Sequence, residues 1–462
     1  MPDTASASPH NDPYAYDPTH VLPPPVSLVG TLGRIGPGLL LTATIVGTGE
    51  LIATTVLGAK VGYVMLWAII FSCVVKTIVQ AMWGRYTIAT GETGLAAVNH
   101  LPGPRLGGVN WVVWAFALMI VCALSLTGAM YAGVAQVMVK VLPGLSEGQW
   151  VVLLAIFTFV VLVAGQYRHV EFLSIAMVAI FSIMTMCAAL VLTSKPEYFS
   201  WQRAAAGLTF SLPEAGIFAF VTVFGLTGVN SGELFAYPYW CVEKGYARYT
   251  GAREPTEAWR ERARGWIRVM HYDVIASMLV YTSATLAFYL LGAGVLHTLN
   301  IVPQGAETIA VLSRMYTETM GAFGLYLFYV GAVFVLYSTV FAATAANSRI
   351  FADMLRLMGR FPAGDYAARL RAQRVFVGLL ALLPCLLYFA TGEITQMVTI
   401  GGIVLALMLP VIGCAMLYLR YRRLPPELAP SGWFTAGLWL VTALMLATMV
   451  AGLVMKFGAG KT

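Results

Sequence analysis

Two short stretches of this chain repeat the run Gly-Glu-Leu-hydrophobic-Ala, and together they decide its fold. The first is GTGELIATTVLG, residues 47–58, and the second is VNSGELFAYPYW, residues 229–240. Each places one glutamate, Glu50 or Glu233, inside an otherwise apolar stretch. The repetition raises the question of why an apolar chain carries the same polar motif twice.

The composition indicates a membrane protein. Of the 462 residues, 59% are hydrophobic and 11% are charged, whereas an average soluble domain has about 25% charged residues. The apolar residues fall in continuous blocks of about 20, the length of helix that crosses a bilayer. Membrane β-barrels need alternating patterns instead. We therefore predict an all-α polytopic membrane protein.

The apolar blocks predict eleven membrane-spanning helices. They are expected at residues 36–58, 61–84, 109–139, 150–165, 170–193, 213–241, 270–297, 323–346, 374–391, 394–419 and 433–456.

Lysine and arginine are unequally distributed over the loops between these helices. If the N-terminus is cytoplasmic, most of the 28 Lys and Arg residues fall in cytoplasmic loops, above all in residues 244–268 and 349–374. Short loops rich in positive charge stay on the cytoplasmic side. The pattern predicts a cytoplasmic N-terminus and an outside C-terminus, and we interpret the two arginine-rich loops as solvated, partly helical segments near anionic lipid. The net charge of +7 thus requires no nucleic-acid partner.

The chain divides into a tail and two halves. Residues 1–33 are polar and proline-rich, which predicts a disordered cytoplasmic tail. Residues 34–193 contain predicted helices 1–5 and residues 194–423 contain helices 6–10. Residues 424–462 contain helix 11 and the C-terminus.

The sequence lacks the motifs typical of disulfide frameworks, zinc sites, ATP-binding sites and hydrolases. The six cysteines lie in or beside apolar blocks without metal-ligand spacing, so neither a disulfide framework nor a zinc site is expected. The chain has no GxxxxGK[ST], HExxH or GxSxG motif. We expect no enzyme activity, no cofactor and no ATP-driven transport.

The two Gly-Glu motifs lie in helices 1 and 6, which are corresponding members of two five-helix halves. An odd number of helices per half gives the halves opposite orientations, so weak similarity between them indicates an inverted repeat.

Glycines around the motifs favour broken helices. Each costs about 1 kcal/mol of helix propensity relative to alanine, and they are Gly47, Gly49, Gly225, Gly228 and Gly232. Unwound backbone inside a membrane persists only where it lines a polar cavity or is buried in protein. A buried carboxylate is also costly there, so we expect both glutamates to face a cavity, a partner or a substrate. The alternative is a close-packed glycine seam with a neutral, hydrogen-bonded glutamate.

Longer stretches resemble a known family. GPGLLLTATIVGTGELIATTVLGAKVGYVMLW, residues 36–67, resembles the first two helices of the Nramp family of divalent-metal transporters. VFGLTGVNSGELF falls where the family has its broken sixth helix, STVFAATAANSRIFADMLR resembles the eighth helix, and LALMLPVIG resembles the tenth. The resemblance implies the LeuT-type fold, two inverted five-helix repeats with helices 1 and 6 broken at the substrate site.

The sequence departs from the family at its metal ligands. The Asp-Pro-Gly-Asn motif of helix 1 corresponds to Gly47 through Glu50, so the metal-binding aspartate is replaced by glycine. The Met-Pro-His motif of helix 6 corresponds to residues 229–231, and the glutamine of helix 10 corresponds to Met408. Lys76 stands at a position that is usually apolar in the family.

These departures change the expected substrate. Without thioether and imidazole ligands, selection of Mn, Fe, Co or Zn by direct coordination is disfavoured, whereas carboxylates, hydroxyls and carbonyls suit a hard, partly hydrated ion such as Mg or Ca. We predict metal ligation by Glu50 and Glu233, with substrate contacts from Gly47, Thr48, Gly49, Asn230, Ser231, Gly232 and Met408. Coupling or counter-ion roles fall to Lys76, His271 and the two glutamates.

The sequence therefore predicts a secondary active transporter of a cation, working by alternating access in a bacterial inner (plasma) membrane, with no oligomer required. Transport of a small organic cation or an amino-acid-like solute stays open, as do proton coupling through a glutamate and a sensor with a transporter fold. Lys76 has the alternative of a core-paired or snorkelling lysine.

Overall fold

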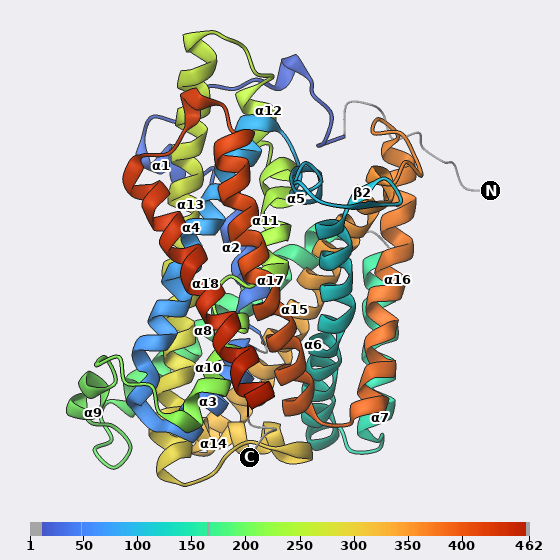
Figure 1. Cartoon of the computed structure of the whole chain (residues 1–462). Helices are drawn as coiled ribbons and strands as arrows, with labels where there is room; N and C mark the ends of the chain where they lie inside the picture. Colours follow the sequence, from blue (N-terminus) through green and yellow to red (C-terminus); the bar gives the residue numbers. More distant parts are fainter. Residues whose placement is uncertain (1–11, 48, 164–166, 459–462) are drawn as a thin grey trace.

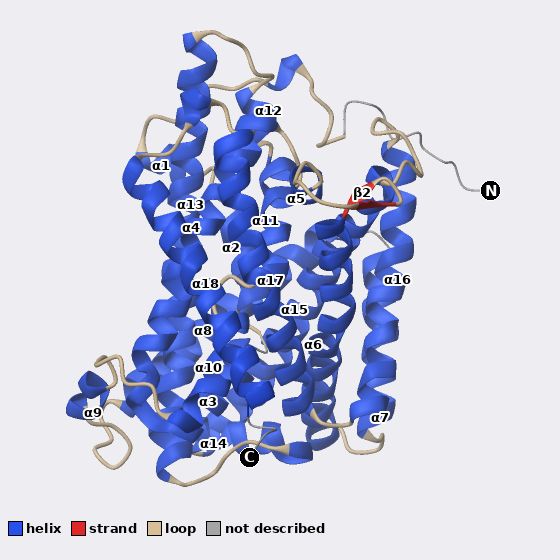
Figure 2. Ribbon diagram, in the orientation of Figure 1, coloured by secondary structure: helices blue, strands red, loops and turns tan. Residues whose placement is uncertain are grey.

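The computed structural model describes residues 12–47, 49–163 and 167–458. The described chain is helical almost throughout, and its strands form one short hairpin between β1 (Arg105–Leu106) and β2 (Val109–Asn110) (Figure 2). Arg105 pairs with Asn110 and Leu106 with Val109 in an antiparallel register.

The helices that cross the long axis of the molecule run in chain order through eleven passes (Figure 1). They are α2 (Pro37–Ile45) with η3 (Gly49–Thr54) and α3 (Thr55–Val61), then α4 (Leu66–Thr90), α6 (Trp111–Val141), α7 (Glu147–Val163), α8 (Tyr167–Leu192), α10 (Glu214–Leu226) with α11 (Ser231–Lys244), α13 (Glu257–Leu291) with η5 (Gly292–Leu296), α15 (Ala322–Leu357), α16 (Tyr366–Thr391), α17 (Ile394–Arg422) and α18 (Gly432–Gly458).

Short helices connect these passes at the two ends. They are η2 (Pro18–His20), α1 (Leu28–Leu32), η4 (Gly62–Met65), α5 (Gly94–Val98), α9 (Trp201–Ala206), α12 (Tyr246–Thr250), η6 (Gly305–Glu307), α14 (Thr308–Met320) and η7 (Pro426–Leu428).

The prediction of a polytopic all-α protein with eleven passes is confirmed. Among the described residues, seven helical stretches are long and apolar enough to cross a membrane, and two shorter apolar helices, Glu147–Val163 and Val178–Leu192, accompany them. The first stretch, Gly49–Thr90, joins the second part of the first pass to α4, and the other parts of the interrupted passes are α2, α10 and α11. The helix that contains the predicted seventh span is longer than that span, because the arginine-rich segment before residue 270, expected to be partly helical, continues the same helix from Glu257.

The two interrupted passes run in opposite directions through the molecule. In Figure 1, α2 and α11 lie in the upper half, and α3 and α10 lie in the lower half. The first pass therefore descends through its break and the sixth pass ascends through its break. This is the arrangement that an inverted repeat requires.

The passes form two packed groups. In one group, α13 packs on α4 and α2, and α11 packs on the same two helices. In the other group, α6 packs on α7, α15 packs on α16, and α16 packs on α7. The breaks lie where the first group meets α6, α15 and α17.

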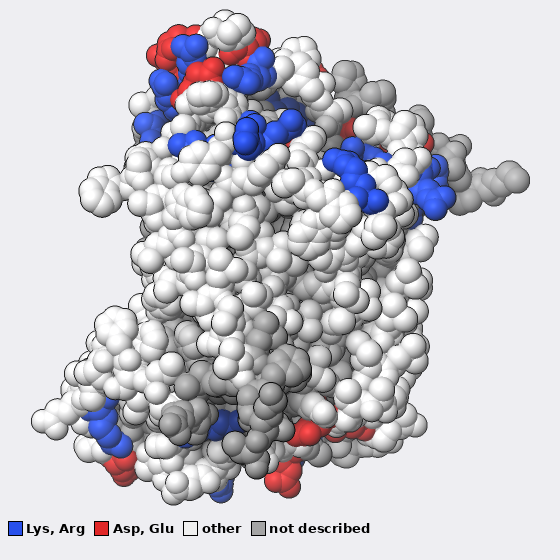
Figure 3. Space-filling view, viewed as in Figure 1, with Lys and Arg blue, Asp and Glu red and all other residues white. Residues whose placement is uncertain are grey.

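Positive charge gathers at one end of the molecule. Figure 3 shows Lys and Arg side chains concentrated at the upper end, around α12 and the start of α13. The opposite end, with α9 and α14, carries fewer of them on this face. The ends of α15 and α16 meet at the charged end, where the buried carboxylate of Asp353 accepts hydrogen bonds from Arg356 (2.7 Å) and Arg369 (3.0 Å).

The same carboxylate connects the two helix groups. Asp353 of α15 also accepts hydrogen bonds from the hydroxyls of Tyr239 in α11 (2.8 Å) and Thr93 (2.6 Å). Hydrogen bonds to a buried charge are stronger than neutral ones. Asp353 therefore holds the two groups together at the charged end.

The tail that the sequence predicts to be disordered is seated on the protein from Asp12 onward, and residues 1–11 lie outside the described residues. Tyr14 donates a hydrogen bond to Glu243 of α11 (2.7 Å), and the guanidinium of Arg369 lies 3.9 Å from the centre of its ring. Farther along, the N–H of Leu22 donates to the carbonyl of Tyr249 (3.1 Å). Composition predicted disorder because it counts polar residues and prolines, whereas one aromatic side chain suffices to anchor the segment.

We expect Tyr14→Ala to release this segment. The substitution removes a hydrogen bond to a charged group and a cation–π contact, which together contribute about 1–3 kcal/mol. Limited proteolysis should cut residues 12–33 faster in Tyr14→Ala than in the native protein. Tyr16→Ala is the matched control, because the side chain of Tyr16 is 55% exposed; equal cleavage of both variants would contradict the anchoring role.

Candidate functional site

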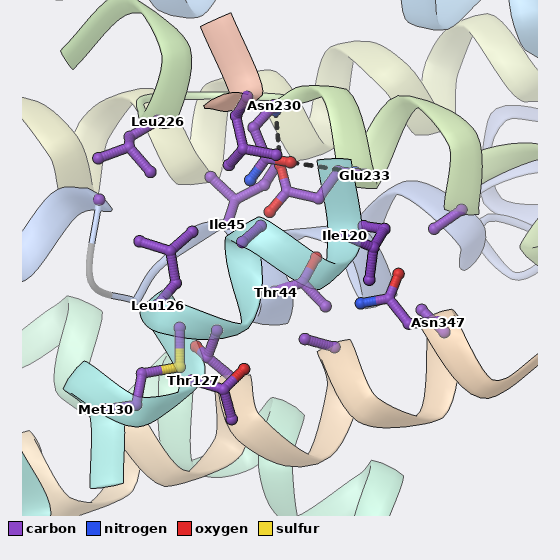
Figure 4. A pocket seen from close by; sticks show the side chains of 18 of the residues that line it. Thr44, Ile45, Ile120, Leu126, Thr127, Met130, Leu226, Asn230, Glu233 and Asn347 are labelled. Carbon is purple, nitrogen blue, oxygen red and sulfur yellow. Dashed lines mark hydrogen bonds between the residues drawn. The ribbon is translucent and has the colours of Figure 1, made fainter. Parts of the chain in front are cut away.

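A cavity lies between the two helix breaks and the second helix group. Its volume is about 90 Å³, room for several water molecules, since one water needs about 10–15 Å³. The walls come from the ends of the broken helices and from α6, α15 and α17 (Figure 4). The lining residues are Thr44, Ile45, Gly49, Ile120, Ala123, Leu124, Leu126, Thr127, Met130, Leu226, Asn230, Gly232, Glu233, Ala236, Thr339, Ala343, Ala346, Asn347 and Leu405.

Glu233 supplies the carboxylate of this cavity. It is the third residue of α11, and it forms a capping box with Asn230. Its carboxylate accepts from the N–H of Asn230 (2.7 Å), and the side chain of Asn230 accepts from the N–H of Glu233 (3.1 Å). This reciprocal pair explains why the sixth pass restarts at Ser231, because it satisfies two backbone donors that the break leaves free. The carboxylate also lies at a helix N-terminus, where negative charge is favoured.

Three further polar side chains lie around the cavity opposite or beside Glu233. Thr44 comes from α2, Thr127 from α6 and Asn347 from α15, and Figure 4 shows all three with Glu233. The sequence analysis assigned none of these three side chains to the site. A sequence signal existed for Asn347, because it follows the small residues 342–346, which are typical of close approaches between membrane helices.

Glu50 lies behind the first break and is not among the lining residues. Its side chain is fully buried. One carboxylate oxygen accepts from the N–H of Gly228 (3.2 Å) and the hydroxyl of Thr285 (3.4 Å), and the other accepts from the N–H of Gly47 (3.5 Å). Glu50 thus joins both breaks to α13. The structure does not bring the two predicted metal ligands together around one cavity.

Lys76 of α4 lies at the end of α10, also fully buried. Its ammonium donates to the carbonyl of Phe224 (2.7 Å) and to the carbonyl of Thr227. Ser72, one turn earlier on α4, contacts the hydroxyl of Thr227 at 2.7 Å. One face of α4 therefore supports the end of α10.

Gly47 permits a close approach between the first break and α15. A Cβ atom at this position would lie 2.7 Å from Oγ1 of Thr339. The one proton of that hydroxyl has its shortest acceptor in the carbonyl of Val335 in the same helix (2.9 Å), and the carbonyls of Val46 (3.2 Å) and Ala43 (3.3 Å) at the end of α2 lie slightly farther away. Where the family resemblance places an aspartate, this chain has no room for any side chain.

The other predicted residues fall into two sets. Asn230, Gly49 and Gly232 line the cavity. Ser231 instead donates to the carbonyl of Leu405 (2.6 Å), which joins α11 to α17.

Two predicted residues lie elsewhere, and one lies outside the described residues. Met408 is buried in α17 and His271 lies beside Phe434 of α18, and neither is among the residues that line the cavity. Thr48 is outside the described part of the chain.

The polar side chains of the cavity surround a single carboxylate. Among the residues that the structure describes, no three His, Cys, Asp or Glu side chains converge as a metal cluster. The cavity offers one carboxylate, two amides and several hydroxyls, which are hard oxygen donors or hydrogen-bonding groups.

A family model described as "Natural resistance-associated macrophage protein-like" (Nramp) matches residues 38–455. The chain belongs to the Nramp family. The match includes both Gly-Glu motifs and all eleven passes apart from their extreme ends, so the resemblance expected from the sequence is confirmed.

Curated relatives cover nearly the whole chain. The divalent metal cation transporter MntH 1 of Pseudomonas aeruginosa is 23% identical over 441 residues, 92% of each protein. The divalent metal cation transporter MntH of Bacillus subtilis is 21% identical over 429 residues, 91% of this chain and 92% of the relative.

Solved structures support the LeuT-type fold. The manganese transporter of Eremococcus coleocola aligns with a TM-score of 0.67 at 16% identity, covering 96% of this chain and 92% of that one. MhsT in complex with L-phenylalanine aligns with a TM-score of 0.59 at 13% identity, covering 93% of this chain and 99% of that one. At these identities the likeness establishes the fold alone.

We expect Gly47→Ala to destabilise the protein by about 1–3 kcal/mol, the typical cost of overpacking a tight site. The added methyl group would collide with the side chain of Thr339, three atoms of which would lie within 3.1 Å of it. Gly437→Ala is the matched control, because its Cβ would meet only the end of the Ile78 side chain, at 3.3 Å. Thermal unfolding in detergent should separate the two variants, and a native-like Tm for Gly47→Ala would contradict the steric account.

Proposed function

We propose that this protein is a secondary active transporter that moves a divalent metal cation by alternating access. The observation that carries the proposal is the carboxylate of Glu233, which faces a cavity between two broken helices of opposite direction. Binding at such breaks is the common arrangement of transporters built from inverted repeats. The curated relatives, named divalent metal cation transporters, support the choice of a metal ion.

The proposed substrate is a hard ion that stays partly hydrated, such as Mg²⁺. A single carboxylate cannot replace the six oxygen ligands that Mg²⁺ holds. The cavity volume of about 90 Å³ accommodates an ion together with several waters. Asn230, Asn347, Thr44 and Thr127 would then hydrogen-bond to the bound waters while Glu233 balances the charge.

Alternating access would arise from movement of one helix group against the other. The cavity lies at their boundary, with Glu233 and Thr44 on the broken helices and Thr127 and Asn347 on α6 and α15. Opening toward the charged end would require α11 to move away from Asp353, which breaks the hydrogen bond that the hydroxyl of Tyr239 donates to this carboxylate. The contact between Asp353 and Tyr239 would therefore close an entrance to the cavity from the charged end.

We place the charged end on the cytoplasmic side of a bacterial plasma membrane. Loops rich in Lys and Arg stay inside, and the N-terminal segment lies at that end while the C-terminus lies at the other (Figure 1). The sequence has no ATP-binding motif of the Walker type, so an ion gradient or the membrane potential would drive uptake.

A small organic cation is the second candidate, and the walls of the cavity favour it. Seven of the lining side chains are large and apolar: Ile45, Ile120, Leu124, Leu126, Met130, Leu226 and Leu405. Such walls suit methyl and methylene groups, while Glu233 would pair with an ammonium group.

The decisive experiment is flux in proteoliposomes with Glu233→Gln. The glutamine can still accept the hydrogen bond that completes the capping box, so the variant should fold while losing the negative charge. We expect Mg²⁺ flux to fall by about 100-fold, equivalent to ~3 kcal/mol. Glu261→Gln is the matched control, because Glu261 is an exposed glutamate remote from the cavity.

The same assay separates the two substrates. Flux of Mg²⁺ or Ca²⁺ that depends on Glu233 supports the hydrated metal ion. Flux of a small primary ammonium ion, without competition by Mg²⁺, would support the organic cation. Native-like Mg²⁺ flux in Glu233→Gln would contradict the proposed role of this carboxylate.

A further inference from the structure

Lys76 and Glu50 bind the two ends of one peptide group at the break of the sixth pass. The carbonyl of Thr227 accepts a hydrogen bond from the Lys76 ammonium. The N–H on the other side of that peptide bond belongs to Gly228, and it donates to Glu50 (3.2 Å). The cation, the peptide dipole and the anion are therefore arranged in series, with the positive end of the dipole toward the carboxylate.

The carbonyl and N–H of this peptide group need hydrogen-bond partners that lipid cannot supply. It follows the last turn of α10, whose final carbonyls have no partner within the helix. Gly228 has φ +61°, which turns the chain sharply toward α11, and a Cβ there would lie 2.9 Å from Cα of Cys73. The break is thus pressed against α4, the helix that carries Lys76.

The Lys76 ammonium occupies the kind of position at which inverted-repeat transporters bind a free cation. Unwound carbonyls and the C-terminal ends of broken helices carry partial negative charge, and in inverted-repeat transporters they coordinate coupling ions. Here two such carbonyls, of Phe224 (2.7 Å) and Thr227, accept from Lys76. The ammonium also lies 5.1 Å from the centre of the Phe224 ring, within reach of a cation–π interaction.

We propose that the Lys76 ammonium acts as a tethered cation at the end of α10, paired with Glu50 through the Thr227–Gly228 peptide. The pair is a neutral brace that fixes the geometry of both breaks. Glu50 is then a positioning residue for the site, and Glu233 is the carboxylate that lines the cavity. No free monovalent cation is needed at this position. The flux measurements that test this inference rest on the proposed function, whereas the Tm measurements do not.

Glu50 extends the brace to the first and seventh passes. It accepts from the N–H of Gly47 at the first break and from the hydroxyl of Thr285 in α13. Loss of either charge would leave the other buried without compensation, which is strongly destabilising. Loss of both should cost less than loss of Lys76 alone, whereas a lysine that only fills space would give no such compensation.

The first test is chemical rescue of Lys76→Ala. This substitution deletes three carbons and the ammonium, which is the size of propylammonium. We expect Lys76→Ala to lower the Tm and to reduce Mg²⁺ flux by at least about 10-fold, as removal of one partner of a buried charge pair does. Propylammonium chloride should raise the Tm and the flux of the variant while leaving the native protein unchanged.

Two controls separate charge from volume. The first control replaces propylammonium by 1-propanol, which has the same number of heavy atoms and no charge, and it should not rescue Lys76→Ala. The second control is Val79→Ala, which opens a cavity at a fully buried position of the same helix and should not respond to propylammonium.

The second test compares Glu50→Gln, Lys76→Met and the double variant. We expect the double variant to unfold at a higher temperature than Lys76→Met and to recover part of the flux. Native flux should not change when choline replaces sodium and potassium. The inference is overturned if propylammonium and 1-propanol act alike on Lys76→Ala and the double variant is no more stable than Lys76→Met.

The readouts keep the two proposals apart. If the native protein carries no Mg²⁺ flux, the proposed function fails, while the Tm measurements still test the brace. If flux depends on Glu233 but the Tm results show no coupling between Lys76 and Glu50, the brace fails and the proposed function stands.

Discussion

Backbone polar groups inside a membrane must find partners within the protein, and this constraint governs the centre of the molecule. The two interrupted passes free carbonyl and N–H groups at a depth where lipid offers none. Among the described residues, several of these freed groups meet a side chain. The side chains are Thr339 beside the end of α2, Lys76 at the end of α10, Asn230 and Glu233 at the start of α11, and Glu50 between them. The site is therefore a consequence of how the breaks are satisfied.

The two glutamates show how one motif acquires two roles. Both follow a glycine in nearly the same sequence, yet Glu233 lies in the first turn of a helix that faces the cavity, and Glu50 lies in a π-helical turn that faces α13. The inverted repeat is only approximate at the level of side chains. One carboxylate is used to hold the breaks together, and the other is exposed to whatever occupies the cavity.

Much of the architecture was predictable from the sequence because hydrophobic length and charge asymmetry are strong physical signals. Nine of the eleven predicted spans begin close to the start of an observed helix. The helices that contain spans 7 and 9 begin earlier, at Glu257 and Tyr366, because a charged stretch is equally compatible with a loop or with helix beyond the membrane. The breaks were predictable from paired glycines. The direction of each side chain was not, since a position such as Met408 lies on the expected helix but packs away from the cavity.

The departure from the family at Gly47 has a structural reason as well as a chemical one. The aspartate expected there from the resemblance would occupy the space of Thr339. The polar side chains that line the cavity are one carboxylate, amides and hydroxyls, and in the proposed function they hold an ion through its water shell.

The distance between the bound ion and the carboxylate of Glu233 tests this account most directly. It can be measured in an experimental structure of the protein with Mn²⁺ soaked in as an anomalous scatterer at the magnesium position. We predict ion density in the cavity at about 4 Å or more from Glu233, beyond the ~2.0–2.6 Å of direct oxygen coordination, with Glu50 still bound to the N–H of Gly228. Direct coordination of the ion by Glu50 and Glu233 together would contradict the account.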